Sequence, residues 1–249
     1  MPITIAGKQY SYQLDTGADV VIAYGSGERS GWVKKADFTL AKQIEFAGAT
    51  LPSIPIFRME NVSATDVQGT VGLDLLVGRT FVIDFPKKRV CLLNRADMPD
   101  ALSRAAEWVP AEIRNGKLFI DDVQLNGSKI DVIYDTGTSP DQIATDFSLW
   151  GKATGMQLNS PGVTHKVAQT WGENVEYLTA PTTGSLEIGK QVYAHALLTS
   201  APSRPTSFHD NIFGASGALG NALFFDSIVI LDLGSHPYFG VVTPVKAKN

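Results

Sequence analysis

The tripeptide Asp-Thr-Gly occurs twice in this chain, at residues 15–17 and 135–137. Each copy closes a short strand-like run, Gln13-Leu14 in the first case and Ile133-Tyr134 in the second, and each Gly allows a sharp turn after the Asp. One such tripeptide arises easily by chance, whereas two copies at matching positions constrain the fold strongly. We therefore predict that Asp15 and Asp135 each follow a strand and face each other across a pseudo-twofold axis.

Other spacings repeat with the tripeptide. A glycine precedes each Asp by eight residues, at Gly7 and Gly127. Further along, Gly72 precedes Asp84 by twelve residues, and Gly220 precedes Asp232 by twelve. An internal duplication explains the repeated tripeptide and these two coincident spacings better than chance does. The alternative is a set of unrelated β-hairpins that share common turn residues.

Composition limits the class of protein. The chain has 249 residues, of which 44% are hydrophobic and 18% charged, as in a globular protein with a large core. A net charge of -4 gives no reason to expect a nucleic-acid partner or an anionic membrane, and no apolar run is long enough to span a bilayer. The single Cys91 excludes an intrachain disulfide. The first residues lack the pattern of a signal peptide, which leaves open a cytosolic protein or the mature part of an exported one.

The order of strand, turn and helix signals predicts a mainly β protein in two related parts. We expect an N-terminal lobe over residues 1–96, a helical connector over 97–110 and a C-terminal lobe over 111–249. The connector contains a proline and an alanine-rich run that favour a short helix. Ser139-Pro140-Asp141 predicts a second helix, which would run through Trp150.

A pair of aspartates suits one kind of chemistry. Two carboxylates a few ångströms apart cannot both ionise at low cost, so one proton stays between them. One carboxylate can then act as base toward a water molecule while the other protonates a carbonyl oxygen. Gly17 and Gly137 have no Cβ, so backbone can approach the carboxylates closely. Each tripeptide taken alone would be explained equally well as a surface turn capped by its Asp.

The motifs resemble those of aspartic peptidases of the pepsin and retropepsin superfamily. Residues 14–19 (LDTGAD) are close to the retroviral motif, and residues 134–139 (YDTGTS) are closer to the C-terminal motif of pepsins. The matching elements Thr70-Val71-Gly72 and Ala218-Leu219-Gly220 also fit the family. The resemblance covers nearly the whole chain and is that of a fused retropepsin dimer or a short bacterial pepsin-like enzyme. It implies a bilobal acid protease fold, in which two small β-barrel lobes enclose an active-site cleft. It also implies that the hydroxyls of Thr16 and Thr136 bond across the axis to the opposite lobe.

The chain departs from the pepsin pattern beside the first Asp. Ala18 stands where pepsins commonly carry Ser or Thr, whereas its counterpart Thr138 keeps a hydroxyl. Losing one hydrogen bond to the ionised pair raises its pKa. We therefore expect an acidic to mildly acidic pH optimum, higher than that of a gastric pepsin. By resemblance, Asp19 would bond the backbone of a bound peptide, the alternative being an exposed turn carboxylate.

The two halves differ in length between their corresponding glycines. Asp15 and Gly48 are 33 residues apart, whereas Asp135 and Gly189 are 54 apart, which leaves 21 extra residues in the second half. They include a hairpin candidate over residues 166–177. We predict that this hairpin is the main flap over the active site, with Trp171-Gly172 near its tip, although an ordinary peripheral hairpin has the same pattern. Asp19, Thr138, Trp171 and Gly172 are thus the predicted substrate-binding residues.

Three functions fit the sequence. The first is an aspartic endopeptidase in which Asp15 and Asp135 activate a water molecule to hydrolyse peptides or unfolded proteins. The second is a catalytically silent relative that binds a peptide or protein, and the third is a different two-carboxylate hydrolase such as a glycosidase. No cofactor or metal is expected, because the four histidines show neither ligand spacing nor a carboxylate partner motif. We expect a monomer, since one duplicated chain supplies both aspartates.

Overall fold

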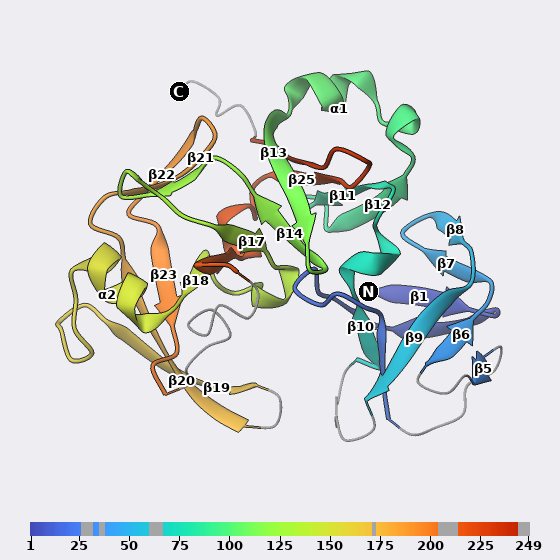
Figure 1. The fold of residues 1–249 in the computed structure, drawn as a ribbon, viewed down its shortest axis with the longest axis horizontal. Helices are drawn as coiled ribbons and strands as arrows, with labels where there is room; N and C mark the ends of the chain where they lie inside the picture. The colour runs from blue at the N-terminus through green and yellow to red at the C-terminus, as the bar shows by residue number, and fades with distance from the viewer. Residues whose placement is uncertain (26–31, 35–37, 60–66, 171–172, 204–213, 244–249) are drawn as a thin grey trace.

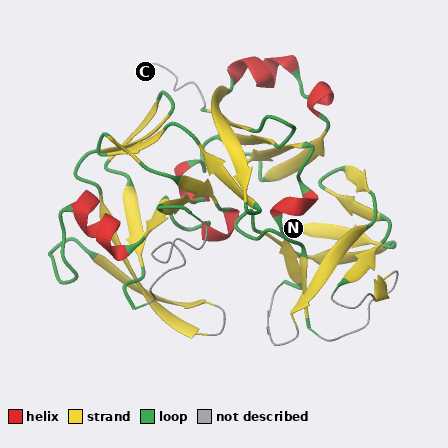
Figure 2. Ribbon diagram, viewed as in Figure 1, coloured by secondary structure: helices red, strands yellow, loops and turns green. Residues whose placement is uncertain are grey.

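The computed structural model describes residues 1–249 except 26–31, 35–37, 60–66, 171–172, 204–213 and 244–249. The described chain is mainly β, with two short α-helices, α1 (Asp100–Ala105) and α2 (Phe147–Thr154), and its strands form four sheets (Figure 2). None of the helices in this part of the chain is long and apolar enough to cross a membrane.

Two of the sheets have four strands each and the same internal order. The first has the order β2-β1-β7-β8, with bounds Lys8–Ser11, Pro2–Ile5, Ile44–Phe46 and Ala49–Leu51. The second has the order β16-β15-β21-β22, with bounds Ser128–Lys129, Val123–Leu125, Ser185–Ile188 and Gln191–Ala194. The turns between β7 and β8 and between β21 and β22 contain Gly48 and Gly189, so the two glycines do correspond.

A run of six strands is also repeated. In the first half it is β3-β10-β4-β9-β6-β5, with bounds Gln13–Leu14, Gly69–Val71, Ile22–Tyr24, Ile54–Met59, Thr39–Ala41 and Trp32–Lys34. In the second half it is β17-β24-β18-β23-β20-β19, with bounds Val132–Tyr134, Gly217–Leu219, Ile143–Thr145, Leu197–Ser200, Glu173–Pro181 and Thr164–Thr170. Each neighbouring pair is parallel or antiparallel in the same way in both runs. The topology therefore supports the internal duplication.

The halves meet in a set of strands that belongs to both. Its order is β12-β11-β25-β26-β13-β14, with bounds Arg89–Leu93, Thr80–Asp84, Ile228–Asp232, Tyr238–Val242, Glu107–Arg114 and Lys117–Ile120. In the antiparallel pair of β11 and β25, Val82 lies opposite Ile230. These two residues are 148 positions apart, as Gly72 and Gly220 are, so they are equivalent in the duplication. A pseudo-twofold axis therefore passes through their pairing.

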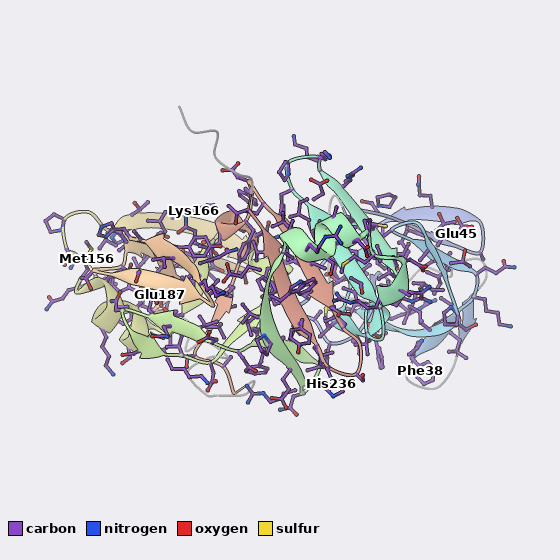
Figure 3. All side chains as sticks on the ribbon, turned by 90° about the horizontal axis from the view of Figure 1, so that it is seen from above. Phe38, Glu45, Met156, Lys166, Glu187 and His236 are labelled. Atoms are coloured by element: carbon purple, nitrogen blue, oxygen red, sulfur yellow. The ribbon has the colours of Figure 1, made fainter. Side chains whose placement is uncertain are left out.

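The arrangement is visible along the long axis of the molecule. Figure 1 shows the first-half strands on the right, the second-half strands on the left, and β11, β12, β25 and β13 above and between them. Seen from above, Phe38 and Glu45 of the first half lie toward one end, and Met156 and Glu187 of the second half lie toward the other (Figure 3). One buried cluster nevertheless runs through both halves, from Ile3 to Val241.

Burial alternates along β1, whereas three central strands are buried at every residue. In β1, Ile3 and Ile5 are buried, whereas Pro2 is exposed and Thr4 only partly buried. β10, β17 and β24 are buried along their whole length, because other strands and their side chains cover both faces. These three central strands lead to the two Asp-Thr-Gly turns or lie beside them.

Three expectations need correction. The described strands make open sheets, and no closed barrel forms in either half. The connector does contain α1, but β13 already begins at Glu107, inside the predicted connector. The predicted helix over residues 139–150 is wrong at its start, because residues 143–145 pair as β18 between β23 and β24. Helix α2 begins only after Asp146, whose side chain accepts a hydrogen bond from Leu149 N at 2.8 Å.

Candidate active site

The two Asp-Thr-Gly turns occupy equivalent places at the ends of β3 and β17. β3 runs parallel to β10, and β17 runs parallel to β24. The backbone N–H of Asp15 donates to the carbonyl of Val71 at 3.0 Å, and that of Asp135 donates to the carbonyl of Leu219 at 2.9 Å. Each turn is thus held by a strand, β10 or β24, that ends just before the glycine of the repeated element at 70–72 or 218–220.

That element requires glycine in both halves. A methyl group at Gly72 would collide with the carbonyl oxygen of Val20, and one at Gly220 would collide with the carbonyl oxygen of Thr138. The backbone that follows each Asp therefore crosses directly over a glycine. This close crossing explains why the sequence pattern recurs at residues 70–72 and 218–220.

Reciprocal hydrogen bonds join the two turns through Thr16 and Thr136. The hydroxyl of Thr16 donates to the carbonyl of Tyr134 at 2.8 Å and accepts from Thr136 N at 3.0 Å. The hydroxyl of Thr136 donates to the carbonyl of Leu14 at 3.0 Å and accepts from Thr16 N at 3.0 Å. Both threonines are buried. The cross-axis bonds expected from the resemblance are present, and they fix the two turns relative to each other.

This link brings the two carboxylates into contact. A methyl group at Gly17 would lie 2.5 Å from Asp135 Cγ, and one at Gly137 would lie 2.7 Å from Asp15 Oδ1. The side chains of Asp15 and Asp135 also hydrogen-bond each other. Each glycine of the tripeptide therefore makes room for the carboxylate of the opposite half, as the sequence suggested.

The electrostatics of the pair favour a retained proton. Burial, the charge of Asp135 and the hydrogen bond to Asp135 together raise the pKa of Asp15 to about 7, against the opposing effect of the N–H groups of Gly17 and Ala18. A carboxyl group with such a pKa stays protonated under mildly acidic conditions. The site can therefore hold one proton and one negative charge at once.

The donors around the two carboxylates are unequal. Asp135 accepts from Gly137 N at 2.7 Å through Oδ1 and from the Thr138 hydroxyl at 2.8 Å through Oδ2. Asp15 accepts from Gly17 N at 3.0 Å and from Ala18 N at 3.2 Å, both through Oδ1. Thr138 thus contacts a carboxylate of the pair, and its contact with a substrate stays a prediction.

A polar link behind the second turn escaped the sequence analysis. The Tyr134 hydroxyl donates to Asn221 Oδ1 at 2.7 Å, and Asn221 Nδ2 donates to the Ser139 hydroxyl at 3.0 Å and to the carbonyl of Thr136 at 3.3 Å. Tyr134 and Asn221 are buried. The equivalent positions of the first half hold Leu14 and Leu73, so that turn has apolar packing there. A polar residue directly after Gly220, at a position where the first half has Leu, is the sequence signal that could have indicated the link.

Asp19 lies beside the first turn and is exposed. A methyl group at Gly116, in the turn between β13 and β14, would collide with its Cβ, so Asp19 touches a turn of the second half. Its negative charge also acts on Asp74, which lies two residues after Gly72. Burial, together with the charge of Asp19, raises the pKa of Asp74 to about 6. The contact of Asp19 with a bound peptide stays a prediction.

The equivalent hairpins of the two halves differ in length. β5 and β6 pair over three residues, whereas β19 and β20 pair over seven. The predicted hairpin at 166–177 thus exists within residues 164–181, and most of the extra length of the second half lies in this hairpin and around α2. Figure 1 shows the β19–β20 hairpin on the side of the molecule opposite the shared strands. Trp171 and Gly172, predicted at its tip, lie outside the described residues.

Two further polar contacts near this hairpin were missed. The Thr199 hydroxyl of β23 donates to Asp141 Oδ1 at 2.9 Å, and burial raises the pKa of Asp141 against the effects of Thr199 and Lys166. His165 of β19 lies 2.9 Å from Glu176 of β20, a carboxylate partner for which the sequence shows no motif. Both groups of the His165 pair are substantially exposed, and such a pair contributes little to stability.

Comparison with known proteins adds no family to this geometry. A scan against models of protein families gave no match, and a search of curated proteins found no significantly similar sequence. The site is therefore interpreted from its own residues.

Proposed function

We propose that this chain is an aspartic endopeptidase of the pepsin and retropepsin type, in which Asp15 and Asp135 activate a water molecule to cleave peptide bonds. The observation that carries the proposal is the set of reciprocal hydrogen bonds of Thr16 and Thr136 across the axis, which brings the carboxylates of Asp15 and Asp135 into contact. A pair of surface turns with capping aspartates would have no reason to meet in this way.

The chemistry of such a pair suits amide hydrolysis. The ionised carboxylate takes a proton from water, and the protonated one donates to the carbonyl oxygen, so no strong external base is needed. The raised pKa of Asp15 keeps the required proton in place at mildly acidic pH. The buried threonine bonds hold both carboxyl groups in position before substrate arrives, which lowers the reorganisation needed in the transition state.

The duplicated topology suits the same proposal at the level of fold. Two related lobes, each with a four-stranded sheet and a six-stranded run, would bring one Asp each to a cleft between them. The β19–β20 hairpin would cover that cleft from the second lobe and bind an extended peptide, with Asp19 and Thr138 near the peptide backbone. Peptides and unfolded proteins are therefore the proposed substrates, and a monomer the proposed active form.

Digestion of a denatured protein across pH 3–7 tests the proposal. We expect the wild type to cleave, and Asp15→Asn and Asp135→Asn each to lose at least about a thousandfold in rate, because either change removes one partner of the acid–base pair. Asp121→Asn is the matched control, since Asp121 is exposed and outside the site. Peptide binding without cleavage by the wild type would instead indicate a silent binding protein.

A further inference from the structure

In each half, one face of the sheet carries the aspartate of the pair. Side chains alternate along a strand, so Ile133 shares a face with Asp135, and its neighbours Val132 and Tyr134 lie on the other face. Val132 and Tyr134 belong to the large buried cluster that runs through both halves, whereas Ile133 belongs to a separate cluster. A peptide that reaches the carboxylates therefore lies over the face of Ile133, and its side chains meet the residues of that face.

Strand pairing extends this face sideways in both halves. Residues that pair across neighbouring strands have their side chains on the same face. In the second half the pairing runs from β17 to β23 along the row Ile133, Ala218, Ala144 and Thr199. In the first half it runs from β3 to β9 along the equivalent row Gln13, Thr70, Ile22 and Phe57. Neighbouring strands are about 4.8 Å apart, so each row ends about 14 Å from the strand that leads to the Asp.

The outer ends of the two rows differ in chemistry. In the first half, the ring of Phe57 packs against that of Phe38 with 6.1 Å between their centroids, and both residues are partly exposed. At the equivalent place in the second half, the Thr199 hydroxyl donates to Asp141 Oδ1 at 2.9 Å and shares a hydrogen bond of 3.0 Å with the Thr179 hydroxyl. One half thus has an aromatic pair where the other has a carboxylate and two hydroxyls.

Asp141 has a hydroxyl partner but, among the described residues, no ion-pair partner. Its side chain is partly exposed, and burial raises its pKa because the carboxylate has lost part of its hydration. The charge of Lys166 on β19 opposes this effect from a longer distance, and Lys166 is itself exposed. A cationic group of a bound peptide would gain a charge-assisted hydrogen bond at Asp141.

We propose, resting on the peptidase function above, that the site selects peptides by two unlike side chains, a large apolar one against Phe57 and Phe38 and a basic one against Asp141. These places lie in opposite halves; Phe38 and, beside Asp141, Lys166 mark them in Figure 3. The two selected residues therefore lie on opposite sides of the scissile bond. An extended peptide rises about 3.4 Å per residue and its side chains reach further, so each selected residue is about two to four positions from that bond.

The unlike ends also give the peptide a direction. The paired turns are related by the pseudo-twofold axis, so they alone would accept a peptide in either direction. A peptide with one apolar and one basic residue matches both outer ends in one direction only, and in the other direction it places a cation against the aromatic pair and an apolar group against a carboxylate.

Cleavage of a mixed peptide library at mildly acidic pH, with the cut sites identified by mass spectrometry, tests the selectivity. We expect Lys or Arg to be enriched about tenfold at one position on one side of the cut, and large apolar residues about tenfold on the other side. Asp141→Asn should abolish only the basic preference. Phe57→Thr, which copies the second half, should abolish only the apolar one. Asp121→Asn is the control and should change neither preference. Cleavage without either preference would overturn the proposal.

Lys166→Gln gives a check that keeps the residues of both places intact. Removing a positive charge near Asp141 should strengthen the preference for a basic residue, because that charge repels the cation of the peptide. An unchanged or weaker basic preference would contradict the role of Asp141.

Peptide binding to Asp135→Asn separates the selectivity from the peptidase function. Fluorescence anisotropy compares a peptide that contains Lys with one that has norleucine, an uncharged residue of similar length, at the same position. We expect the norleucine peptide to bind about tenfold more weakly to Asp135→Asn, and equally to the variant that also carries Asp141→Asn. Selective binding by a chain whose wild type cleaves nothing would refute the peptidase function and leave the selectivity standing. Equal binding of both peptides to Asp135→Asn would refute the selectivity.

Discussion

The first and second Asp-Thr-Gly turns share their backbone and differ in the groups that surround it. In both, the Asp ends a strand, the Thr bonds across the axis, and the Gly faces the opposite carboxylate. Only the second turn adds a hydroxyl donor, Thr138, and a buried polar brace, Asn221 with Tyr134.

The difference separates two requirements of the site. The threonine bonds and the glycines, which are the same in both halves, set the distance and orientation of the carboxylates. They are repeated because each half supplies the hydrogen-bond partner and the space that the other half needs. The parts that differ change the hydrogen bonds that each carboxylate receives, and those hydrogen bonds affect how strongly its charged form is stabilised. The duplication therefore accounts for the geometry of the pair and leaves the difference between its two surroundings unexplained.

The largest expected effect comes from breaking the shared part. Thr16→Val removes a buried hydroxyl and leaves the N–H of Thr136 and the carbonyl of Tyr134 without a partner, at a cost of about 3 kcal/mol in the free energy of unfolding. Thr136→Val should cost about the same, because its bonds are equivalent. Urea denaturation measures both, with Thr16→Ser and Thr136→Ser as controls that keep the hydroxyl. Clearly unequal costs would contradict the symmetry of the link.

Removing the brace should cost less and affect one half only. Asn221→Leu makes the second turn resemble the first, and it leaves the Tyr134 hydroxyl and the Thr136 carbonyl without a partner. We expect it to lower the free energy of unfolding by about 2 kcal/mol. Tyr134→Phe alone should cost about 1 kcal/mol. In a double-mutant cycle the two changes should cost less together than their separate costs added, since the residues share one hydrogen bond. Strict additivity would show that they do not interact.

The raised pKa of Asp15 should appear in the pH dependence of stability. Because the pKa of Asp15 is raised in the folded state, its contribution is fully present below the ordinary carboxyl pKa and is lost as the pH rises toward about 7. The free energy of unfolding of the wild type should therefore fall between about pH 4 and 7 relative to that of Asp15→Asn, which is neutral throughout. Parallel curves from denaturation at a series of pH values would argue against a raised pKa.

The smallest expected effect is on the pH optimum. Ala18→Ser gives the first carboxylate a hydroxyl donor like that of the second, so it should lower the optimum for cleavage by less than about one pH unit. The pH profile of kcat/KM for one peptide substrate, measured on wild type and variant together, reveals the shift. A shift to higher pH would contradict the role assigned to the missing donor.

The features that occur in both halves could be predicted from the sequence. Asp15 and Asp135, and the glycines at 72 and 220, could be predicted because each half repeats the same local constraint. The brace was hidden, since Tyr134 and Asn221 are 87 positions apart and meet only through the parallel pairing of β17 and β24. His165 and Glu176 likewise become neighbours only through the register of their hairpin.

The helix predicted over residues 139–150 was wrong at its start, also because of strand pairing. Residues 139–146 have an early proline and helix-compatible residues, yet Ile143–Thr145 forms a strand because β23 and β24 lie on either side of it. Tertiary pairing of this kind overrides a local preference. The prediction of closed barrels was wrong for another reason. The sheet of the second half continues through β14 and β13 into the shared strands and does not close on itself.

The central claim is that Asp15 and Asp135 form one catalytic unit, and the cleavage rate of the double variant tests it most directly. Wild type, Asp15→Asn, Asp135→Asn and the double variant are compared on one peptide at one mildly acidic pH. If the two carboxylates share a single function, the double variant should be no slower than either single variant, because the first change already abolishes the pair. A double variant slowed by the product of the two single effects would mean that the aspartates act independently, and the account would be wrong.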